Sequence, residues 1–201
     1  MNLLWMMNML KELSLQDNRK GINMKRIIGS SFLELSEKKS INKITIANIV
    51  ENCELTQPTF YRYFKDKYDM MIWIYVNEIG KSFEKIGTDK HEWKDTIIDG
   101  VVYFRENKKF LINALKHTSG RDSFLWQMSK MNIEFMENEI KKEMHTKEFP
   151  KDLSILIKIY CYGTIQFLCE WLIEDIPLDP NELASLLEKS IPEDLKPFLY
   201  K

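Results

Sequence analysis

The sequence predicts an all-α protein in which a three-helix head, containing a helix-turn-helix, is joined through a long fourth helix to a larger helical bundle. Apolar residues recur at intervals of three and four along most of the chain, as they do on the buried face of an amphipathic helix. No stretch shows the sustained two-residue alternation, bounded by hairpin turns, that is typical of strands. Only seven Gly and six Pro interrupt the 201 residues, which also favours helices.

The composition is that of a globular protein. Hydrophobic residues make up 44% of the chain, which excludes wholesale disorder, and 29 Lys and Arg balance 30 Asp and Glu. The balance hides a difference between segments, because residues 20–69 hold nine basic and six acidic residues whereas residues 70–201 are net acidic. An indiscriminate coater of nucleic acid is therefore excluded, and a site-specific binder with a mildly basic head is not.

Residues 1–19 form an N-terminal extension. Leu3, Met6 and Leu10 fall at helical spacing, which favours a short helix docked on the body. An upstream start codon, with the functional chain beginning near Met24, explains the same stretch. A signal peptide would need a basic residue near its start, and none lies among the first ten residues. Since no run approaches the roughly 18–20 apolar residues of a membrane span, we expect a soluble, cytoplasmic protein without a membrane partner.

The head is predicted to span residues 20–67. Its first helix covers roughly residues 21–38, with Phe32 on the apolar face. Phe60 and Phe64 stand four residues apart and anchor its third helix in the core.

A helix-turn-helix lies between them. Thr45 can cap a short helix through its side chain, and Cys53-Glu54-Leu55 form a tight turn. Thr56 caps the next short helix, and Pro58 lies in its first turn, where a missing N–H costs little. Two short helices joined by a three-residue turn are typical of this motif.

The outward side chains of the motif suit contact with DNA. Gln57 can pair with adenine in the major groove, and Pro58 and Thr59 can touch thymine methyl groups. The candidate DNA-contacting residues are Thr45, Thr56, Gln57, Pro58, Thr59, Tyr61, Arg62, Tyr63 and Lys67. Lys67 lies in the first turn of the next helix, where backbone N–H groups also face an anion. An ordinary pair of helices with exposed polar residues is the other interpretation.

The run Thr56-Gln-Pro-Thr-Phe-Tyr-Arg-Tyr-Phe-Lys-Asp-Lys-Tyr-Asp-Met70, with Lys43-Ile44-Thr45 before it, resembles the DNA-binding domain of TetR/AcrR-type transcriptional regulators. The resemblance covers about residues 24–75. It implies two kinds of contact. The implied phosphate contacts are Thr45, Tyr61, Tyr63 and Lys67, and the implied base contacts are Gln57, Pro58 and Thr59.

Two positions depart from the pattern of that family. Glu54 stands where the turn normally has Gly, so we expect Glu54 to adopt a left-handed backbone conformation at a cost of about 1 kcal/mol. Tyr63 replaces the usual His. The phenol preserves a hydrogen-bond donor for phosphate and makes that contact insensitive to pH near neutrality.

The body is predicted to span residues 68–201. A long helix runs from Asp66, a good N-cap, to about Ile86. Further helices are expected at about residues 91–106, 108–117, 121–144, 151–172 and 180–189. The resemblance implies that this body binds an effector and dimerises. The stretch from Tyr162 to Leu172 is similar to the branch of dihydroxyacetone-kinase-operon regulators.

The last two of these helices are the expected dimer interface. Apolar residues cover so wide an arc of the helix at 151–172 that two of its sides must be buried. By resemblance, this helix and the next pair with their copies. The implied contacts are Leu156, Tyr160, Gly163, Phe167, Leu183, Leu186 and Leu187. Burial within one subunit alone is the alternative.

An effector pocket is expected among the middle helices. Its candidate lining residues are Tyr103, Phe104, Phe110, Trp126, Met131, Phe135, Tyr160 and Trp171. A plain apolar core explains the same residues. The sequence has no Gly-rich phosphate loop, no Cys/His metal cluster and no nucleophile–base pair, so we expect no catalytic residues, no metal and no cofactor. Its three cysteines fit a reducing compartment.

These features predict a homodimeric transcriptional regulator, a repressor by default, that binds a palindromic double-stranded DNA operator. A small-molecule effector or a protein partner at the body would tilt the long helix and change the spacing of the heads. The alternative is a co-regulator or helical adaptor that a protein partner controls and that has no small-molecule pocket.

Overall fold

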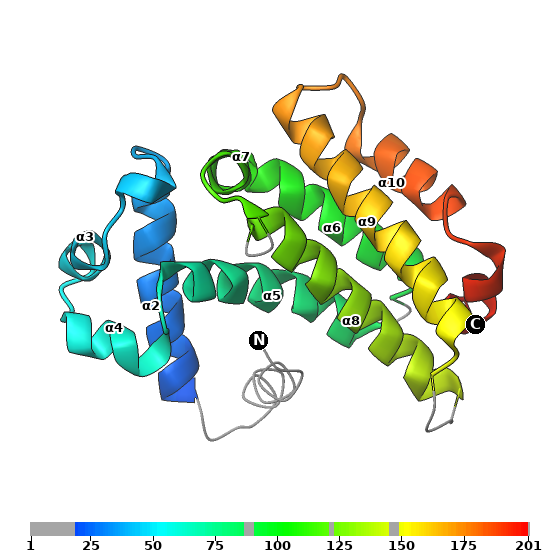
Figure 1. Ribbon diagram of the computed structural model, residues 1–201, viewed down its shortest axis with the longest axis horizontal. Helices are drawn as coiled ribbons and strands as arrows, with labels where there is room; N and C mark the ends of the chain where they lie inside the picture. Colours follow the sequence, from blue (N-terminus) through cyan, green and yellow to red (C-terminus); the bar gives the residue numbers. More distant parts are fainter. Residues whose placement is uncertain (1–18, 87–90, 121–122, 145–148, 201) are drawn as a thin grey trace. The chain divides into compact units, whose positions relative to one another are not determined.

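The computed structural model describes four stretches of the chain: residues 19–86, 91–120, 123–144 and 149–200. All regular elements in these stretches are helices, which confirms the predicted class (Figure 1). The chain divides into two compact units, Met1–Asn77 (unit 1) and Glu78–Lys201 (unit 2). This division lies further along the chain than the expected boundary after residue 67. The docking helix expected in residues 1–18 lies outside the described residues.

Unit 1 is a three-helix head followed by the first part of a long helix. Its elements are α2 (Arg19–Ser36), the 3-10 turn η2 (Ile41–Lys43), α3 (Ile46–Asn52), α4 (Gln57–Tyr63) and α5 (Lys67–Lys85), which continues into unit 2. α2 packs on both α3 and α4, and Phe32, Ile49 and Phe60 are fully buried. Gly29 brings α2 close to α5, because a Cβ there would lie 3.3 Å from the Ile74 side chain.

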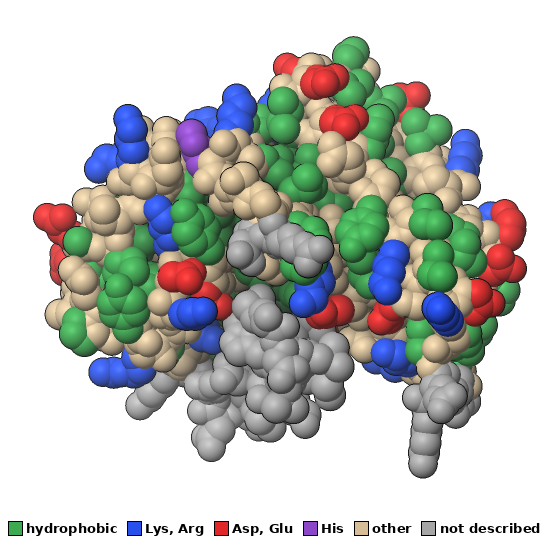
Figure 2. All heavy atoms as spheres, viewed as in Figure 1, with side chains coloured by type: hydrophobic (Ala, Val, Ile, Leu, Met, Phe, Trp, Pro, Cys, Tyr) green, Lys and Arg blue, Asp and Glu red, His purple; other side chains and the backbone are tan. Residues whose placement is uncertain are grey.

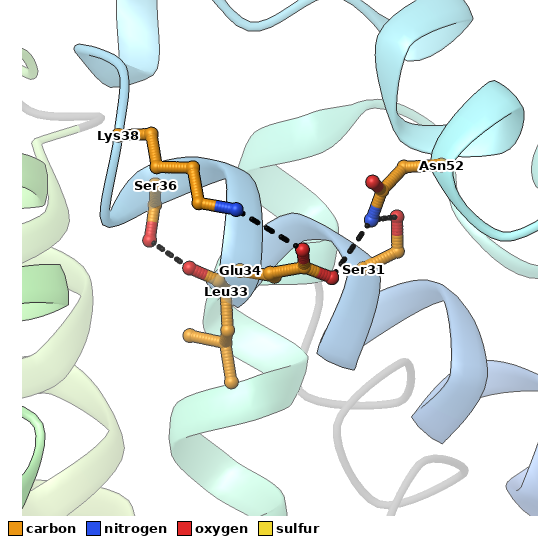
Figure 3. Close-up of polar contacts among 6 residues, drawn as sticks. All are labelled: Ser31, Leu33, Glu34, Ser36, Lys38 and Asn52. Carbon is orange, nitrogen blue, oxygen red and sulfur yellow. Dashed lines mark hydrogen bonds and ion pairs between the residues drawn. The ribbon is translucent and has the colours of Figure 1, made fainter.

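A polar cluster ties α3 to α2 (Figure 3). The Asn52 side-chain amide donates to Ser31 Oγ at 3.1 Å and to Glu34 Oε2 at 3.2 Å, and Ser31 Oγ donates to the carbonyl of Ile49 at 2.7 Å. Lys38 Nζ lies 3.3 Å from Glu34 Oε1. The amide of Asn52, and then Lys38, hold the pKa of the Glu34 carboxyl below its usual value. The cluster therefore fixes the first helix of the helix-turn-helix on α2.

Unit 2 is a helical bundle. After the end of α5, its elements are α6 (Trp93–Glu106), α7 (Lys108–Lys116), α8 (Phe124–Met144), α9 (Lys151–Ile173), α10 (Pro180–Lys189), η4 (Glu193–Leu195) and α11 (Lys196–Leu199). The largest contacts join α10 with α6 and α8 with α9, and Figure 1 shows these pairs side by side. The expected helices are all present, with ends that differ by a few residues.

α9 is long and apolar enough, by length and composition alone, to cross a membrane, which the sequence was not expected to contain. One face of this helix packs inside unit 2, where Ile157, Cys161 and Leu168 are buried. Only 33% of its most apolar window is buried, however. α9 therefore has one face in the core and another that is apolar and exposed.

Candidate nucleic-acid interface

The turn between α3 and α4 adopts the backbone that the sequence predicts. Glu54 has a φ of 56°, in the left-handed region, and the amide of Leu55 donates to the carbonyl of Val50 at 2.8 Å to close the turn. A glutamate carries a Cβ that clashes with the following carbonyl in this conformation, at a cost of roughly 1–2 kcal/mol. The turn is thus strained where a glycine would not be.

Thr45 begins α3 with a capping box. Its Oγ1 accepts a hydrogen bond from the Asn48 amide at 3.2 Å, and Asn48 Oδ1 accepts one from the Thr45 amide at 3.1 Å. The cap uses the Thr45 hydroxyl as an acceptor, so its proton remains available to a phosphate oxygen. The predicted cap is confirmed.

The N-terminus of α4 differs from the expected cap. Thr56 occupies the N-cap position, but its side chain makes no capping hydrogen bond. Instead, Thr56 Oγ1 lies 3.0 Å from Thr59 Oγ1, because both hydroxyls project from the same turn of the helix. Pro58 lies in the first turn, as predicted.

Buried aromatic rings hold α4 in place. Phe60 is 0% exposed, and its ring centroid lies 5.7 Å from that of Phe64. Phe64 in turn packs edge-on against Trp73 of α5. On the opposite side of α4, Tyr61 is 55% exposed, and the ring of Phe60 packs against its ring at 87°. The exposed hydroxyl of Tyr61 is therefore carried on an immobilised ring.

The outer face of α4 is polar, as the sequence predicts. Gln57, Pro58 and Arg62 are exposed, whereas Thr59 and Tyr63 are half-buried. These residues offer amide, guanidinium and hydroxyl groups, which are the side-chain groups that contact base edges and phosphates.

Lys67 is placed differently from the other candidates. Its ammonium donates to the carbonyl oxygens of Ile41 at 2.7 Å and Ile44 at 2.9 Å, and that of Asn42 lies at 3.4 Å. Burial lowers the pKa of Lys67. The anion site expected at the start of α5 is also occupied, because Asp66 Oδ1 accepts from the amides of the next two helix residues at 2.9 and 2.8 Å.

Lys43 is a basic residue that the sequence predictions missed. It ends η2 two residues before Thr45, is exposed, and makes no ion pair or side-chain hydrogen bond with the part of the chain that the structure describes. Lys65, between α4 and α5, is exposed as well. The signal was present in the sequence, since both lysines directly flank the helix-turn-helix.

The expected dimer contacts fall into two groups in unit 2. Leu183 and Leu187 of α10 are buried within the chain, and the Tyr160 hydroxyl donates to the carbonyl of Leu187 at 3.1 Å, so these residues join α9 to α10. Leu156 is half-buried. The exposed members of the set are Gly163, Phe167 and Leu186.

Other exposed apolar residues lie on α9 beside Gly163. Ile155 is 48% exposed, Ile159 65%, Tyr162 46% and Ile173 47%. With Gly163, these residues form one stripe along the helix, which we call the α9 face. Hydrophobic side chains reach the surface along α9 in Figure 2. The α9 face is rotated relative to the expected contacts, because α10 already covers the side that carries Tyr160.

The expected pocket residues are mostly core. Tyr103, Phe104, Phe110, Met131, Phe135 and Trp171 are buried, and only Trp126, at 37%, is exposed. Several pack against other aromatic rings, as Phe135 does by stacking on Phe83 at 4.7 Å and Phe110 does against Phe124. A pocket of about 300 Å³ lies elsewhere in unit 2. It is lined by Ile86, His91, Glu92, Trp93, Glu139, Lys142, Glu143, Phe198, Leu199 and Tyr200.

Known proteins share the sequence pattern and fold of this chain. Residues 33–72 match the family model of bacterial regulatory proteins of the tetR family. A protein from Lactococcus lactis subsp. lactis (strain IL1403), the HTH-type dhaKLM operon transcriptional activator DhaS, is 24% identical over 92 residues. That match covers 46% of this chain and 49% of the relative, so the chain spans about half the length of the curated relative it matches.

Two solved structures have the same fold. The dihydroxyacetone kinase operon activator DhaS superposes with a TM-score of 0.61 at 18% identity, over 89% of this chain and 97% of that one. A TetR transcriptional regulator from Streptococcus agalactiae 2603V gives a TM-score of 0.60 at 15% identity, over 88% and 98%. Residues 91–193, half of the chain, match the family model of a transcriptional regulator C-terminal region. The chain therefore belongs to the TetR family of non-enzymatic, DNA-binding transcriptional regulators and resembles its DhaS branch.

Proposed function

We propose that this regulator acts as a homodimer whose two heads bind the two half-sites of a palindromic operator. The outer face of α4 carries this proposal. Its exposed residues combine groups that read bases, such as the Gln57 amide, with groups that hold phosphates, such as the Tyr61 hydroxyl. The capping box of Thr45 and the burial of Phe60 fix that face on the rest of the head.

The second copy is proposed to cover the α9 face. Four large apolar side chains lie along one stripe of a single helix, and water contact with such a stripe is unfavourable. Gly163 lies in the middle of the stripe, and no described atom is within 4 Å of where its Cβ would be. A copy of α9 can therefore approach closely at Gly163, and a two-fold axis there would bury both stripes at once.

Regulation is proposed to pass along α5. This helix begins in unit 1 and ends in unit 2 without a break, so a shift of its second half changes the setting of its first half. An input that favours one setting would alter how well two heads fit one operator, with a typical coupling of about 1–3 kcal/mol. The similarity to proteins named as operon activators favours activation over the repression expected from the sequence.

A protein partner is a second candidate for the regulatory input. The aromatic side chains expected to line an effector pocket are packed against one another instead. If a small molecule is the input, the 300 Å³ pocket near Trp93 is the proposed site, since it lies within the size range of small-molecule sites. Replacing Leu199, which lines that pocket, by Trp would then abolish the response to a small molecule and spare the response to a protein partner.

Selection of DNA by the purified protein tests the main proposal. Duplexes recovered from a random pool should contain two inverted half-sites whose centres lie about one helical turn apart or a multiple of it. Binding should weaken steeply as salt rises. Recovery of single, unpaired half-sites would contradict the two-headed arrangement, and absence of salt-dependent binding would favour the adaptor alternative.

A further inference from the structure

The ammonium of Lys67 has a hydrogen-bond acceptor for each of its three protons. Two acceptors, the carbonyl oxygens of Ile41 and Ile44, lie at 2.7 and 2.9 Å, and the third, that of Asn42, lies at 3.4 Å. We call these three oxygens the carbonyl cage. A lysine ammonium has three donors and no acceptor, so a phosphate oxygen could bind Lys67 only by displacing a cage carbonyl.

The cage belongs to the segment that positions the helix-turn-helix. Ile41 and Ile44 are 0% and 1% exposed, so their side chains fix the segment in the core while their carbonyls turn toward Lys67. Carbonyls at the end of a short helix such as η2 need partners from outside the helix. The next residue, Thr45, is the N-cap of α3. The position of the cage therefore sets where α3 begins.

Lys67 is itself held at the first turn of α5. Asp66 accepts hydrogen bonds from the amides of Tyr68 and Asp69, and Asp69 Oδ2 accepts one from the amide of Lys65 at 3.0 Å. These bonds fix the start of α5 and use backbone N–H groups that would otherwise face an anion. The ammonium thus joins the start of α5 to a segment 23 residues earlier in the chain.

We infer that Lys67 is a positioning residue for DNA binding: its ammonium fixes the carbonyl cage, and through it the N-terminus of α3, and it does not contact phosphate. This inference rests on the proposed DNA-binding function of the head. Of the nearby lysines, Lys43 is the phosphate contact, because it is exposed beside Thr45 and has no ion pair with the described residues.

Matched Lys67→Met and Lys43→Met variants separate the two roles. Lys67→Met removes the cage donor, so we expect the Tm of the DNA-free protein to fall by about 5 °C or more. Its operator affinity should fall, while the slope of log affinity against log salt stays that of the native protein. Lys43→Met should leave the Tm unchanged and lower that slope by about 1.

An arginine variant decides the case if Lys67→Met does not fold. A guanidinium keeps the charge and still binds phosphate, but its planar fork does not fit a cage built around a compact ammonium. Lys67→Arg should therefore lower the Tm. An unchanged Tm with near-native affinity in Lys67→Arg, or a lowered salt slope with unchanged Tm in Lys67→Met, would overturn the inference.

The Tm measurements need no DNA, which separates the inference from the proposed function. If the native protein shows no salt-dependent DNA binding, the proposed function fails. A loss of Tm in Lys67→Met and Lys67→Arg would still establish the cage, whereas an unchanged Tm in both would refute it.

Discussion

The outer face of α4 and the α9 face suit different partners. On α4 the exposed residues are polar or carry a hydroxyl, as Gln57, Arg62 and Tyr61 do, whereas Ile155 and Ile159 of α9 expose hydrocarbon. Polar groups lose little by leaving water only where matching groups replace it, and apolar groups gain from any close-fitting cover. The contrast assigns selectivity between DNA sequences to α4 and assembly of two heads to α9.

The largest expected effect comes from charge on the α9 face. Gly163→Glu should give a folded monomer, because the new side chain meets no described atom of its own subunit but would be buried against the copy. Losing the second head should lower operator affinity by about 100-fold or more. Sedimentation and gel-shift titration measure the two effects.

Gly100→Glu is the matched control. Gly100 lies in α6, and no described atom is within 4 Å of its Cβ position either. This variant should stay dimeric with native affinity. Monomer formation by Gly100→Glu, or an intact Gly163→Glu dimer, would show that α9 is not the contact between copies.

The next largest effect is expected on the α4 face. Gln57→Ala should weaken the preferred operator by about 1–3 kcal/mol at one base position of each half-site and leave affinity for scrambled DNA unchanged. Competition gel shifts with single-base operator variants measure this. An equal loss on operator and scrambled DNA would recast Gln57 as a contact to the DNA backbone.

A smaller effect should follow from relaxing the turn between the two recognition elements. Glu54→Gly should stabilise unit 1 by about 0.5–1 kcal/mol, because glycine adopts a φ of 56° without the Cβ clash, although it gains more freedom on unfolding. Thermal unfolding with Glu54→Ala as control measures the gain. Equal stability of the Gly and Ala variants would mean that the turn stores no strain.

The smallest effect concerns acid. The folded state lowers the pKa of Glu34, chiefly through the Asn52 amide and then through Lys38, so this carboxylate stabilises the head above its unfolded pKa of 4.5. That contribution is lost as pH falls through the lowered pKa. The Tm of Glu34→Gln should lie below the native value near neutral pH and converge with it in acid. A constant difference would rule out the link.

Local patterns made much of unit 1 predictable. The Thr45 cap and the left-handed Glu54 depend on residues within a few positions of each other, so the sequence indicates both. The cage around Lys67 was not predictable, because its carbonyls come from a segment that only the tertiary fold brings near. A lysine in a DNA-binding motif suggests phosphate contact until its neighbours are known.

Unit 2 shows the same limit. The sequence indicates that α9 is apolar on two sides, but it does not say which side its own subunit covers. That choice depends on α8 and α10, whose packing buries Leu187 and leaves Ile159 at 65% exposure. Likewise, buried aromatic residues such as Phe135 fit a pocket wall and a packed core equally well until their neighbours are placed.

The central claim is that two copies, joined through α9, bind one operator through α4. Titrating the purified protein into a selected operator duplex, at fixed salt and with the mass of the complex measured, tests this claim most directly. We predict two chains per duplex and clear preference over a scrambled duplex of the same length and composition. One chain bound per duplex, or equal affinity for both duplexes, would contradict it.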